Sequence, residues 1–334
     1  MSRLKVGVIG AGAWGRNHVR TVAGLAEAEL AAVCDTDPAV RERTARQYPA
    51  AWVTADVGEV LERSEAVVVA SPARTHAELA LRCIDAGKPC LIEKPFALSL
   101  RDAETVARRA AERRVPVLAG HLLLHHPAIQ RLHAMVQGGE LGRVLYCYSL
   151  RVNLGQVRAD ENALWSFGPH DVSVALDLLG EAPVQVTAHG QCYLQRGVED
   201  VVFLILRFAS GALAHAHMSW LDPHKERKLT VVGTKKMVVF DDMEAREKVR
   251  IYDRGVDRAP EYGSYGESLA IREGDIFVPK VSGAEPLGAE LAHFVRVARG
   301  AEAPRAGPAD GVRVVRVLEA ASRSLADGGA PVAL

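Results

Sequence analysis

The first 120 residues of the chain alternate between short runs that are apolar on both faces and longer segments with helical periodicity. The short runs lie at 4–9, 30–34, 66–70, 90–92 and 115–119. Continuous apolar runs of this length are typical of parallel strands that helices cover on both sides. The intervening segments predict helices at 14–25, 38–47, 75–86 and 99–112. Repeated strand–helix units therefore predict an α/β domain with a doubly wound parallel sheet.

Local signals mark both ends of the helix expected at 75–86. Thr75 and Glu78 have the spacing of a capping box, in which each side chain bonds an amide at the helix start. Gly87 and Pro89 follow, and a glycine with a proline shortly after it is typical of a helix end. We therefore expect the Thr75 side chain to cap this helix.

The pattern changes after a further helix expected at 128–137, and strand-like runs then follow one another with turns between them. The runs lie at 144–152, 184–193, 201–208, 212–220, 228–232, 236–240 and 249–252. Turn signals at 208–212 and 233–234 predict antiparallel hairpins. Helices are expected at 169–179, 290–299 and 311–326, and a long loop at 255–280. The second half thus predicts an α+β domain with a mainly antiparallel open sheet.

We place the domain boundary so that residues 1–122 form the first domain and residues 123–334 the second. The last expected helix has an apolar face, so the late helices can pack back on the first domain. The length of 334 residues agrees with two domains at ~150 residues each.

Composition excludes several classes of protein. Lys and Arg number 41, as do Asp and Glu, so the chain lacks the basic surplus that nucleic-acid binding needs. Five cysteines without a CxxC spacing predict neither a disulfide scaffold nor a metal site. No apolar run approaches the ~20 residues of a membrane span, and the first residues do not resemble a signal peptide. We therefore expect a cytoplasmic protein without a membrane or nucleic-acid partner.

A glycine motif follows the first apolar run and opens the first expected helix. Gly10 permits a tight turn, Gly12 lets a pyrophosphate approach the backbone, and Gly15 allows helix and strand to pack closely. Free amides at the helix start can hold the phosphates. The residues expected to contact a dinucleotide here are Gly10, Gly12, Ala13, Trp14 and Gly15.

Asp35 ends the next strand, 20 residues after Gly15. A carboxylate at this point can accept hydrogen bonds from ribose hydroxyls and would repel a 2′-phosphate, so the motif favours NAD over NADP. Asp37 competes for the same role. The alternative interpretation is a bare glycine turn followed by a surface aspartate.

Polar residues also follow the strands expected at 66–70 and 90–92. Because ligands bind outside the carboxyl ends of parallel strands, Ser71, Pro72 and His76 are candidate cofactor contacts, unless they form only a turn and a helix start. Glu93 and Lys94 emerge from a buried run and must be solvated, paired or functional. A lysine in a cleft can accept a proton or anchor charge, whereas the alternative is a strand-end salt bridge.

In order and spacing, the glycine motif, Ser71-Pro72 with His76, and Glu93-Lys94-Pro95 resemble the glucose–fructose oxidoreductase (Gfo/Idh/MocA) family. The resemblance extends over nearly the whole chain. Members of this family are mostly NAD(P)-dependent oxidoreductases of sugars, inositols and nucleotide sugars. The resemblance implies that Glu93 and Lys94 lie at the cofactor and that Lys94 is the active-site lysine. It also implies a homodimer or homotetramer built through the open face of the second-domain sheet.

The sequence departs from the family pattern at two points. The family has an Asp four residues before a His in its second domain, and here Ser166 replaces that Asp while His170 matches the His. Asp171 or Asp177 could supply the missing carboxylate. The family's Gly-x-Asn-x-Arg run is also missing after the strand at 115–119, so His121 could contact the cofactor instead.

His170 follows Pro169, and proline is favoured at the first position of a helix. A histidine in that first turn is kept neutral by the positive end of the helix dipole, which suits a base for a sugar hydroxyl. The alternative is a helix-start histidine that bonds the backbone. A polar segment at 153–165 leads into this helix, and Arg158 and Asn162 could bind substrate or form loop salt bridges. The candidate substrate contacts are Arg158, Asn162, Trp165, Ser166 and Asp171.

These patterns and the resemblance together predict an NAD-dependent oxidoreductase that transfers a hydride between a sugar hydroxyl carbon and nicotinamide, with Lys94 and His170 as catalytic residues. Segments 153–170 and 222–225 are similar to the branch that oxidises C3 of UDP-N-acetyl-glucosaminuronate or related nucleotide sugars. A free-sugar or inositol dehydrogenase is the second hypothesis. A non-catalytic dinucleotide-sensing regulator is the third, and the presence of both Lys94 and His170 argues against it.

Overall fold

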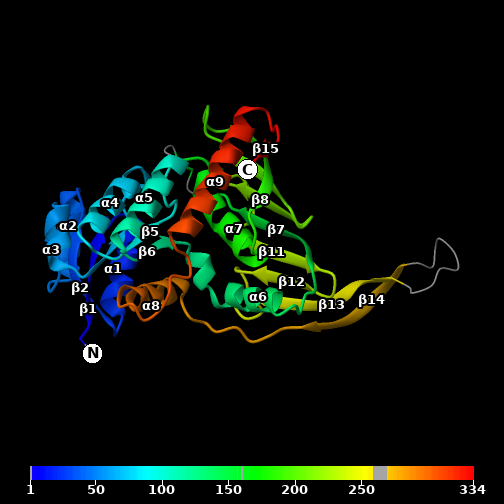
Figure 1. Ribbon diagram of the computed structural model, residues 1–334, viewed down its shortest axis with the longest axis horizontal. Coiled ribbons are helices and arrows are strands. Elements are labelled where there is room, and N and C mark those ends of the chain that lie inside the picture. The colour runs from blue at the N-terminus through cyan, green and yellow to red at the C-terminus, as the bar shows by residue number, and fades with distance from the viewer. Residues whose placement is uncertain (1, 156, 159–160, 259–268) are drawn as a thin grey trace. The chain divides into compact units, whose positions relative to one another are not determined.

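The computed structural model describes residues 2–155, 157–158, 161–258 and 269–334 (Figure 1). The chain divides into two compact units. The first comprises Met1–His126 with Ala284–Arg316, and the second comprises Pro127–Gly283 with Val317–Leu334. Compared with the predicted domains, the first unit therefore also holds residues 123–126 and 284–316.

The first unit is built on a six-stranded parallel sheet with the order β3-β2-β1-β4-β5-β6. Its strands are β1 (Leu4–Ile9), β2 (Ala28–Cys34), β3 (Trp52–Thr54), β4 (Ala66–Val69), β5 (Cys90–Glu93) and β6 (Val117–Gly120). Every residue of β4, β5 and β6 is buried, as the continuous apolar runs predict. The strand order reverses beside β1, so the prediction of a doubly wound Rossmann-type sheet is confirmed.

Helices connect these strands, and several begin at side-chain caps. The Asp37 carboxylate accepts the Ala39 amide hydrogen at 2.8 Å at the start of α2 (Pro38–Gln47). The Ser99 hydroxyl oxygen accepts the Asp102 amide hydrogen at 3.1 Å at the start of α5 (Leu100–Arg113). Such caps satisfy amides that have no partner within the helix. The other helical elements up to residue 126 are α1 (Gly15–Gly24), α3 (Val57–Arg63), η1 (Ala73–Thr75), α4 (His76–Asp85) and η2 (Leu122–His125).

Two late helices also contribute to the first unit: all of α8 (Pro286–Ala298) and the first half of α9 (Pro308–Ala326). α8 packs against α1, as the orange and blue helices in Figure 1 show. Leu287, Leu291 and Phe294 of α8 share a core with Val19 and Val22 of α1. The apolar face of α8 thereby completes the core beside the glycine motif.

Two features of the first unit differ from the sequence prediction. The structure adds β3 and α3, which the pattern did not predict because β3 is a three-residue edge strand whose Trp52 is 46% exposed. The predicted capping box is wrong, because Thr75 makes no side-chain cap for α4. The Thr75 hydroxyl donates instead to the Pro72 carbonyl oxygen at 2.8 Å, across the turn η1.

The second unit is built on a nine-stranded sheet with the order β14-β13-β12-β11-β7-β10-β9-β8-β15. Neighbouring strands are antiparallel except for β7 and β10, which pair in parallel. The strands are β7 (Val144–Val152), β8 (Pro183–Gln191), β9 (Val201–Phe208), β10 (Leu213–Ser219), β11 (Glu226–Gly233), β12 (Met237–Asp241), β13 (Val249–Arg258), β14 (Leu269–Phe277) and β15 (Val332–Ala333). The prediction of a mainly antiparallel sheet in an α+β domain is confirmed.

The two faces of this sheet differ in burial. The helix α7 (Ala163–Leu179) packs on β7, β9 and β10, where side chains such as Cys147, Leu204 and Met218 are buried. Because side chains alternate along a strand, the residues between them point to the other face. There Tyr148 and Ile205 are 44% and 39% exposed, so this face is open. The remaining helix, α6 (Pro127–Gln137), precedes β7.

Two predictions for the second unit are wrong. The helix expected at 169–179 begins at Ala163, because Asn162 caps it by accepting the Trp165 amide hydrogen at 3.0 Å. The expected loop at 255–280 instead contains most of an antiparallel pair, β13 with β14. The β14 strand is well solvated, with Ile271 79% exposed, so its sequence lacks a buried apolar pattern. Residues 259–268 of that stretch lie outside the described residues.

Candidate functional site

The glycine turn joins β1 to α1 and leaves open space above its middle residue. Gly10 has φ +92°, and a Cβ on Gly15 would lie 2.0 Å from the Gly10 carbonyl oxygen, so neither position accepts a side chain without strain. A Cβ on Gly12 would meet no described atom within 4 Å. The turn therefore combines a tight backbone with an open surface at the amino end of α1, which fits a pyrophosphate. Ala13 and Trp14 continue this surface, and the Trp14 side chain is 43% exposed.

Asp35 lies at the same edge of the sheet and contacts the glycine turn. Its Oδ2 accepts the Ala11 amide hydrogen at 2.8 Å, and its Oδ1 accepts the Asp37 amide hydrogen at 2.9 Å. Each carboxylate oxygen has a second lone pair, so Asp35 can still accept from ribose hydroxyls. Asp37 uses its carboxylate as the cap of α2. Of the two competing aspartates, Asp35 is thus the one that contacts the glycine turn.

The loop after β4 touches the glycine turn, because a Cβ on Gly10 would lie 2.6 Å from the Ser71 amide nitrogen. Ser71 and Thr75 share a hydroxyl hydrogen bond at 2.7 Å, and Pro72 is exposed beside them. His76 is buried, with Nδ1 2.8 Å from the Pro95 carbonyl oxygen and Nε2 2.8 Å from the Ser71 carbonyl oxygen. The His76 ring therefore links the loop after β4 to the loop after β5.

Glu93 is the buried centre of a hydrogen-bond network at the end of β5. Its Oε1 accepts the Trp14 indole N–H at 2.6 Å and lies 2.7 Å from Nε2 of His18, while Oε2 accepts the Lys94 amide hydrogen at 2.9 Å. Burial favours the protonated acid, but the hydrogen bonds from His18 and Trp14, with the nearby charge of Lys94, outweigh it and hold the pKa of Glu93 below its usual range. Glu93 is thus an ionised anchor that joins the glycine turn to the Lys94 loop.

Lys94 follows β5, and His121 follows the neighbouring strand β6 at the same level. Glu93 and Gly120 are register partners in these parallel strands, so the next residue of each strand leaves the sheet at the same edge. Lys94 is half-buried, whereas His121 is 1% exposed and its ring nitrogens have no hydrogen-bond partner among the described residues. Burial lowers the pKa of His121 to about 4, so its ring is neutral at pH 7. The sheet edge therefore presents a lysine beside a neutral imidazole.

In the second unit, α7 and its cap residue carry five of the predicted residues: Asn162, Trp165, Ser166, His170 and Asp171. Asn162 caps the helix and donates its amide hydrogen to Glu199 Oε2 at 2.6 Å, and the Trp165 indole N–H donates to the Ser322 hydroxyl at 3.0 Å. Ser166 is buried and His170 is half-buried one helical turn later, so both lie on the same side of α7.

The predicted place of His170 in the first turn of its helix is wrong. Pro169 lies inside α7, six residues after its first residue Ala163. The helix dipole acts mainly within the first turn, so it provides no reason for a neutral His170. The misreading arose because proline is common at the first helical position.

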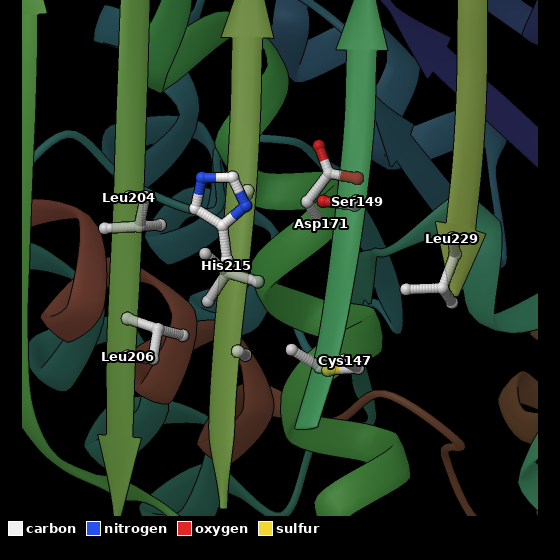
Figure 2. Close-up of a pocket in the computed structure, with 11 residues that line it drawn as sticks. Cys147, Ser149, Asp171, Leu204, Leu206, His215 and Leu229 are labelled. Carbon is white, nitrogen blue, oxygen red and sulfur yellow. The ribbon is translucent and has the colours of Figure 1, made fainter. Parts of the chain in front are cut away.

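The two aspartates that could have replaced the family's Asp are bound elsewhere. Arg151 donates to both carboxylate oxygens of Asp171, at 2.9 and 3.2 Å, and His133 Nδ1 lies 2.8 Å from Asp177 Oδ2. Asp171 also lines a small cavity between α7 and the sheet. Figure 2 shows it with Ser149 amid mostly apolar side chains. The cavity is thus lined by one partner of a structural ion pair.

The predicted loop residue Arg158 pairs with Glu161 at 3.0 Å, and its carbonyl oxygen accepts the Gln195 side-chain amide hydrogen at 2.9 Å. Its neighbours 156, 159 and 160 in the predicted substrate segment lie outside the described residues. The structure thus gives Arg158 and Asn162 intramolecular partners, which leaves their roles toward substrate as predictions.

Sequence reasoning missed His18 and Glu290. Both are buried completely, His18 on α1 and Glu290 on α8, and both are polar residues on otherwise apolar helix faces. A polar residue at a core position was the available signal, but its partner lies far away in the sequence: His18 binds Glu93, 75 residues later.

Two further features are absent from the described part of the chain. Its helices include none with the length and apolar character that a membrane span requires. Its His, Cys, Asp and Glu side chains form no group of three or more arranged to hold a metal ion.

Residues 4–121 match the family model described as "Oxidoreductase family, NAD-binding Rossmann fold", and residues 129–239 match the GFO/IDH/MocA C-terminal domain. The chain belongs to the GFO/IDH/MocA oxidoreductase family. The two matched ranges include every residue that the sequence predicts for the site. The resemblance carried by Glu93, Lys94 and the glycine turn is confirmed.

Relatives within the GFO/IDH/MocA family differ in how much of the chain they match. An inositol 2-dehydrogenase of Saccharopolyspora erythraea is 35% identical over 222 residues, which are 63% of this chain and 65% of that protein. The match thus spans less than two thirds of that relative's own length. A UDP-N-acetylglucosamine 3-dehydrogenase of Acidithiobacillus ferrooxidans is 28% identical over 266 residues, 78% of this chain and 80% of that protein.

A solved structure matches the whole chain. GenD2 from gentamicin A biosynthesis, crystallised in complex with NAD, has a TM-score of 0.82 and 28% identity and covers 100% of this chain and 97% of its own. The family fold therefore extends through both units of the chain.

Proposed function

We propose that this protein is an NAD-dependent dehydrogenase that oxidises a secondary hydroxyl group of a sugar or cyclic polyol. The observation that supports it is the gathering of the open glycine turn, Asp35 and Lys94 at the carboxyl ends of β1, β2 and β5. Ligands of doubly wound sheets bind at this edge. The family membership and the NAD complex of GenD2 are in keeping with the proposal.

The chain's own residues divide the work. The glycine turn holds the pyrophosphate. The Asp35 carboxylate accepts hydrogen bonds from the ribose hydroxyls, and its charge favours NAD over NADP. The cofactor contacts proposed beside them are Ser71, Pro72, His76, Glu93 and His121. When bound, the nicotinamide ring accepts the hydride from the carbon that bears the hydroxyl group.

We propose that His170 accepts the proton of the substrate hydroxyl group and that Lys94 positions the hydroxyl oxygen. As the hydride leaves the carbon, His170 accepts the proton and the C–O bond becomes a carbonyl, so charge and atoms balance. The ammonium of Lys94 donates a hydrogen bond to the oxygen as negative charge develops on it. The two roles can be exchanged without changing this balance.

For the substrate we propose a nucleotide sugar oxidised at C3, of the UDP-N-acetylglucosamine or UDP-N-acetyl-glucosaminuronate type. The 3-dehydrogenase relative matches 80% of its own length, whereas the inositol relative matches only 65%. A free-sugar or inositol dehydrogenase is the second candidate, because identity to that relative is higher, at 35%. Candidate substrate contacts remain Arg158, Asn162, Trp165, Ser166 and Asp171.

Turnover with a substrate panel tests the proposal. The purified chain is incubated with NAD and either UDP-N-acetylglucosamine, its uronate, myo-inositol or free sugars, and NADH formation is followed by absorbance. NADH with a UDP-sugar supports the nucleotide-sugar assignment, and NADH with myo-inositol alone favours the second candidate. NAD binding without turnover on any panel member would favour the dinucleotide-sensing regulator.

We also propose that the protein forms a homodimer or homotetramer through the open face of the second-unit sheet. Exposed apolar side chains occupy five positions on β7, β9 and β10, namely Tyr146, Tyr148, Phe203, Ile205 and Leu213. An apolar surface of this kind on a sheet is typical of a protein interface. A second copy of the same face, packed by a twofold axis, would cover it.

A further inference from the structure

The first unit contains a buried carboxyl group that the proposed chemistry does not use. Glu290 lies on the α8 face formed by Leu287, Leu291 and Phe294, and its exposed fraction is zero. Neither Oε1 nor Oε2 has a hydrogen-bond partner among the described residues. An unpaired carboxylate in such a place is strongly unfavourable, so the group is expected to carry a proton. Burial and the negative charge of Glu93 both raise the pKa of Glu290 well above its usual value.

The neighbouring helix α1 has unpaired polar atoms that can accept a hydrogen bond. His18 is fully buried, and its Nδ1 has no partner among the described residues, nor has the buried hydroxyl of Thr21 one turn later. Nε2 of His18 lies 2.7 Å from the ionised Glu93 carboxylate, which can only accept hydrogen bonds. Nε2 must therefore carry the hydrogen, and in a neutral ring Nδ1 is then an acceptor.

Donor and acceptor thus match across the packed helices α1 and α8. A protonated Glu290 has one O–H to donate, and His18 Nδ1 has one lone pair to accept it. No direct bond joins them in the structure. A buried water needs two to four polar partners, and the unpaired atoms of Glu290, His18 and Thr21 on these two helices are of the kinds that can bind one.

We propose that Glu290 is a positioning residue: as a neutral acid it bonds His18 through one buried water, and so fixes the His18 ring that holds Glu93 beside Lys94. The catalytic relevance of this hydrogen-bond network rests on the function proposed above. The structural part of the proposal does not rest on that function, because it concerns the protonation and hydrogen bonding of groups inside the first unit.

Other titratable groups face the same region and bear on any pH dependence. Glu93 comes from β5 and His18 from α1. His125 ends η2, which packs on α8, and His121 directly precedes η2. On α8 itself, the ring of His293 lies 5.2 Å from that of His125 and bonds Glu302 at 2.7 Å. Burial lowers the pKa of His121 to about 4 and that of His125 to about 3, so neither histidine supplies a positive charge to Glu290 at pH 7.

Infrared spectroscopy of the full chain in D₂O at pH 7 tests the protonation directly. We expect a carboxylic-acid C=O band in the wild type that is lost in Glu290→Gln. The matched control is Glu285→Gln at the residue before α8, because Glu285 is exposed and paired with Arg20 at 2.7 Å. This control should retain the band. A wild type without the band, or a band that persists in Glu290→Gln, overturns the proposal.

Nitrogen NMR of the histidine rings tests the link to His18, whose signals are assigned by their loss in His18→Asn. In the wild type we expect His18 to carry its hydrogen on Nε2, with Nδ1 shifted by an accepted hydrogen bond. Glu290→Gln can still donate from its amide and should preserve the Nδ1 shift, whereas Glu290→Leu should abolish it. Equal Nδ1 shifts in wild type and Glu290→Leu would overturn the link.

The kinetic arm separates a positioning role from simple packing. With whichever panel substrate is turned over, Glu290→Leu should lower kcat and change its pH profile while KM for NAD changes little, and Glu290→Gln should retain more turnover. If Glu290→Leu does not fold, the infrared and Glu290→Gln results still decide the protonation. Loss of the proposed function would leave both spectroscopic outcomes intact, so the two failures are distinguishable.

Discussion

The backbone amide of Ala11 donates its hydrogen to the Asp35 carboxylate at 2.8 Å. This bond joins the glycine turn after β1 to the end of β2. The carboxylate that would bind the ribose is therefore fixed to the turn that would bind the phosphates. The same carboxylate accepts the Asp37 amide hydrogen at 2.9 Å, which also orients the start of α2. The position of Asp35 is therefore determined on both sides.

Asp35→Ser should shift cofactor preference from NAD toward NADP. The substitution removes the charge that repels a 2′-phosphate, and the ratio of kcat/KM for NAD to that for NADP should fall by at least about tenfold, the equivalent of 1.4 kcal/mol. Asp37→Ala is the matched control, because it removes the cap of α2 and should cost about 1 kcal/mol of stability without changing the preference. An unchanged ratio in Asp35→Ser would contradict the assignment.

Gly12→Ala should weaken NAD binding without loss of stability. Its methyl group meets no described atom within 4 Å, but it would stand where the pyrophosphate approaches. We expect the Kd for NAD, measured by calorimetry, to rise at least about tenfold while Tm stays constant. Gly15→Ala forms the contrast, because its Cβ would lie 2.0 Å from a backbone oxygen and should lower the unfolding free energy by about 2 kcal/mol or more. Tight NAD binding by Gly12→Ala would argue against this phosphate site.

Lys94→Ala and His170→Ala should each lower turnover by about 10²–10⁴-fold, the usual contribution of general acid–base groups. NAD binding should survive in both variants, since neither removes the glycine turn. Lys5→Ala and His189→Ala are suitable controls, because both residues are exposed and lie outside the predicted site. Near-normal turnover in both Lys94→Ala and His170→Ala would remove the mechanism.

The chain should lose stability in mild acid because of two buried histidines. The pKa of His121 is lowered by burial from 6.5 to about 4, and that of His125 from 6.5 to about 3. Between pH 6.5 and 4 the unfolded state therefore binds more protons than the folded state, so stability falls as pH falls, by about 1.4 kcal/mol per pH unit for each histidine. Above pH 7 both states hold neutral rings, and this contribution is flat.

Urea unfolding at a series of pH values measures this slope. His121→Asn and His125→Leu should each flatten the curve below pH 6.5 by roughly one histidine's share, whatever their stability at pH 8. Identical slopes in wild type and both variants would show that the two rings are not buried in the neutral form.

Phe203→Asp or Ile205→Lys should dissociate the proposed oligomer, because either places a charge on the open face of the second-unit sheet. Light scattering should report a molar mass that falls to 36.0 kDa. Met243→Lys is the control, since Met243 is 44% exposed but lies in the turn after β12. A wild type that is already monomeric would refute the proposal.

Much of the fold could be predicted because burial leaves a signal within each element. The continuous apolar run at 4–9 and the strand-like run at 201–208 coincide with β1 and β9. The signal fails where an element is solvated, as in β14, whose Phe277 is 59% exposed. The sequence also misleads where a residue occurs outside its usual position, as with Pro169, which lies inside α7 although proline is common at the first position of a helix.

The candidate site could be predicted only in part. Gly12 and Asp35 occur at a spacing that a single strand–helix–strand unit explains, so local sequence is enough. The network of Trp14, His18 and Glu93 joins residues 75 to 79 positions apart, and no local pattern specifies such a contact. The capping role of Asn162 was not predicted, because the helix begins at Ala163, before the proline at which the sequence pattern predicts its start.

The helix α9 changes from the first unit to the second between Arg316 and Val317. Expressing either half alone would thus require more than one cut of the gene: the first half needs residues 284–316 joined back to 1–126, and each half retains only a fragment of the helix. A simple truncation at residue 126 would remove α8, with it the core contacts of Leu287 and Phe294, and should yield an insoluble product rather than an isolated nucleotide-binding module.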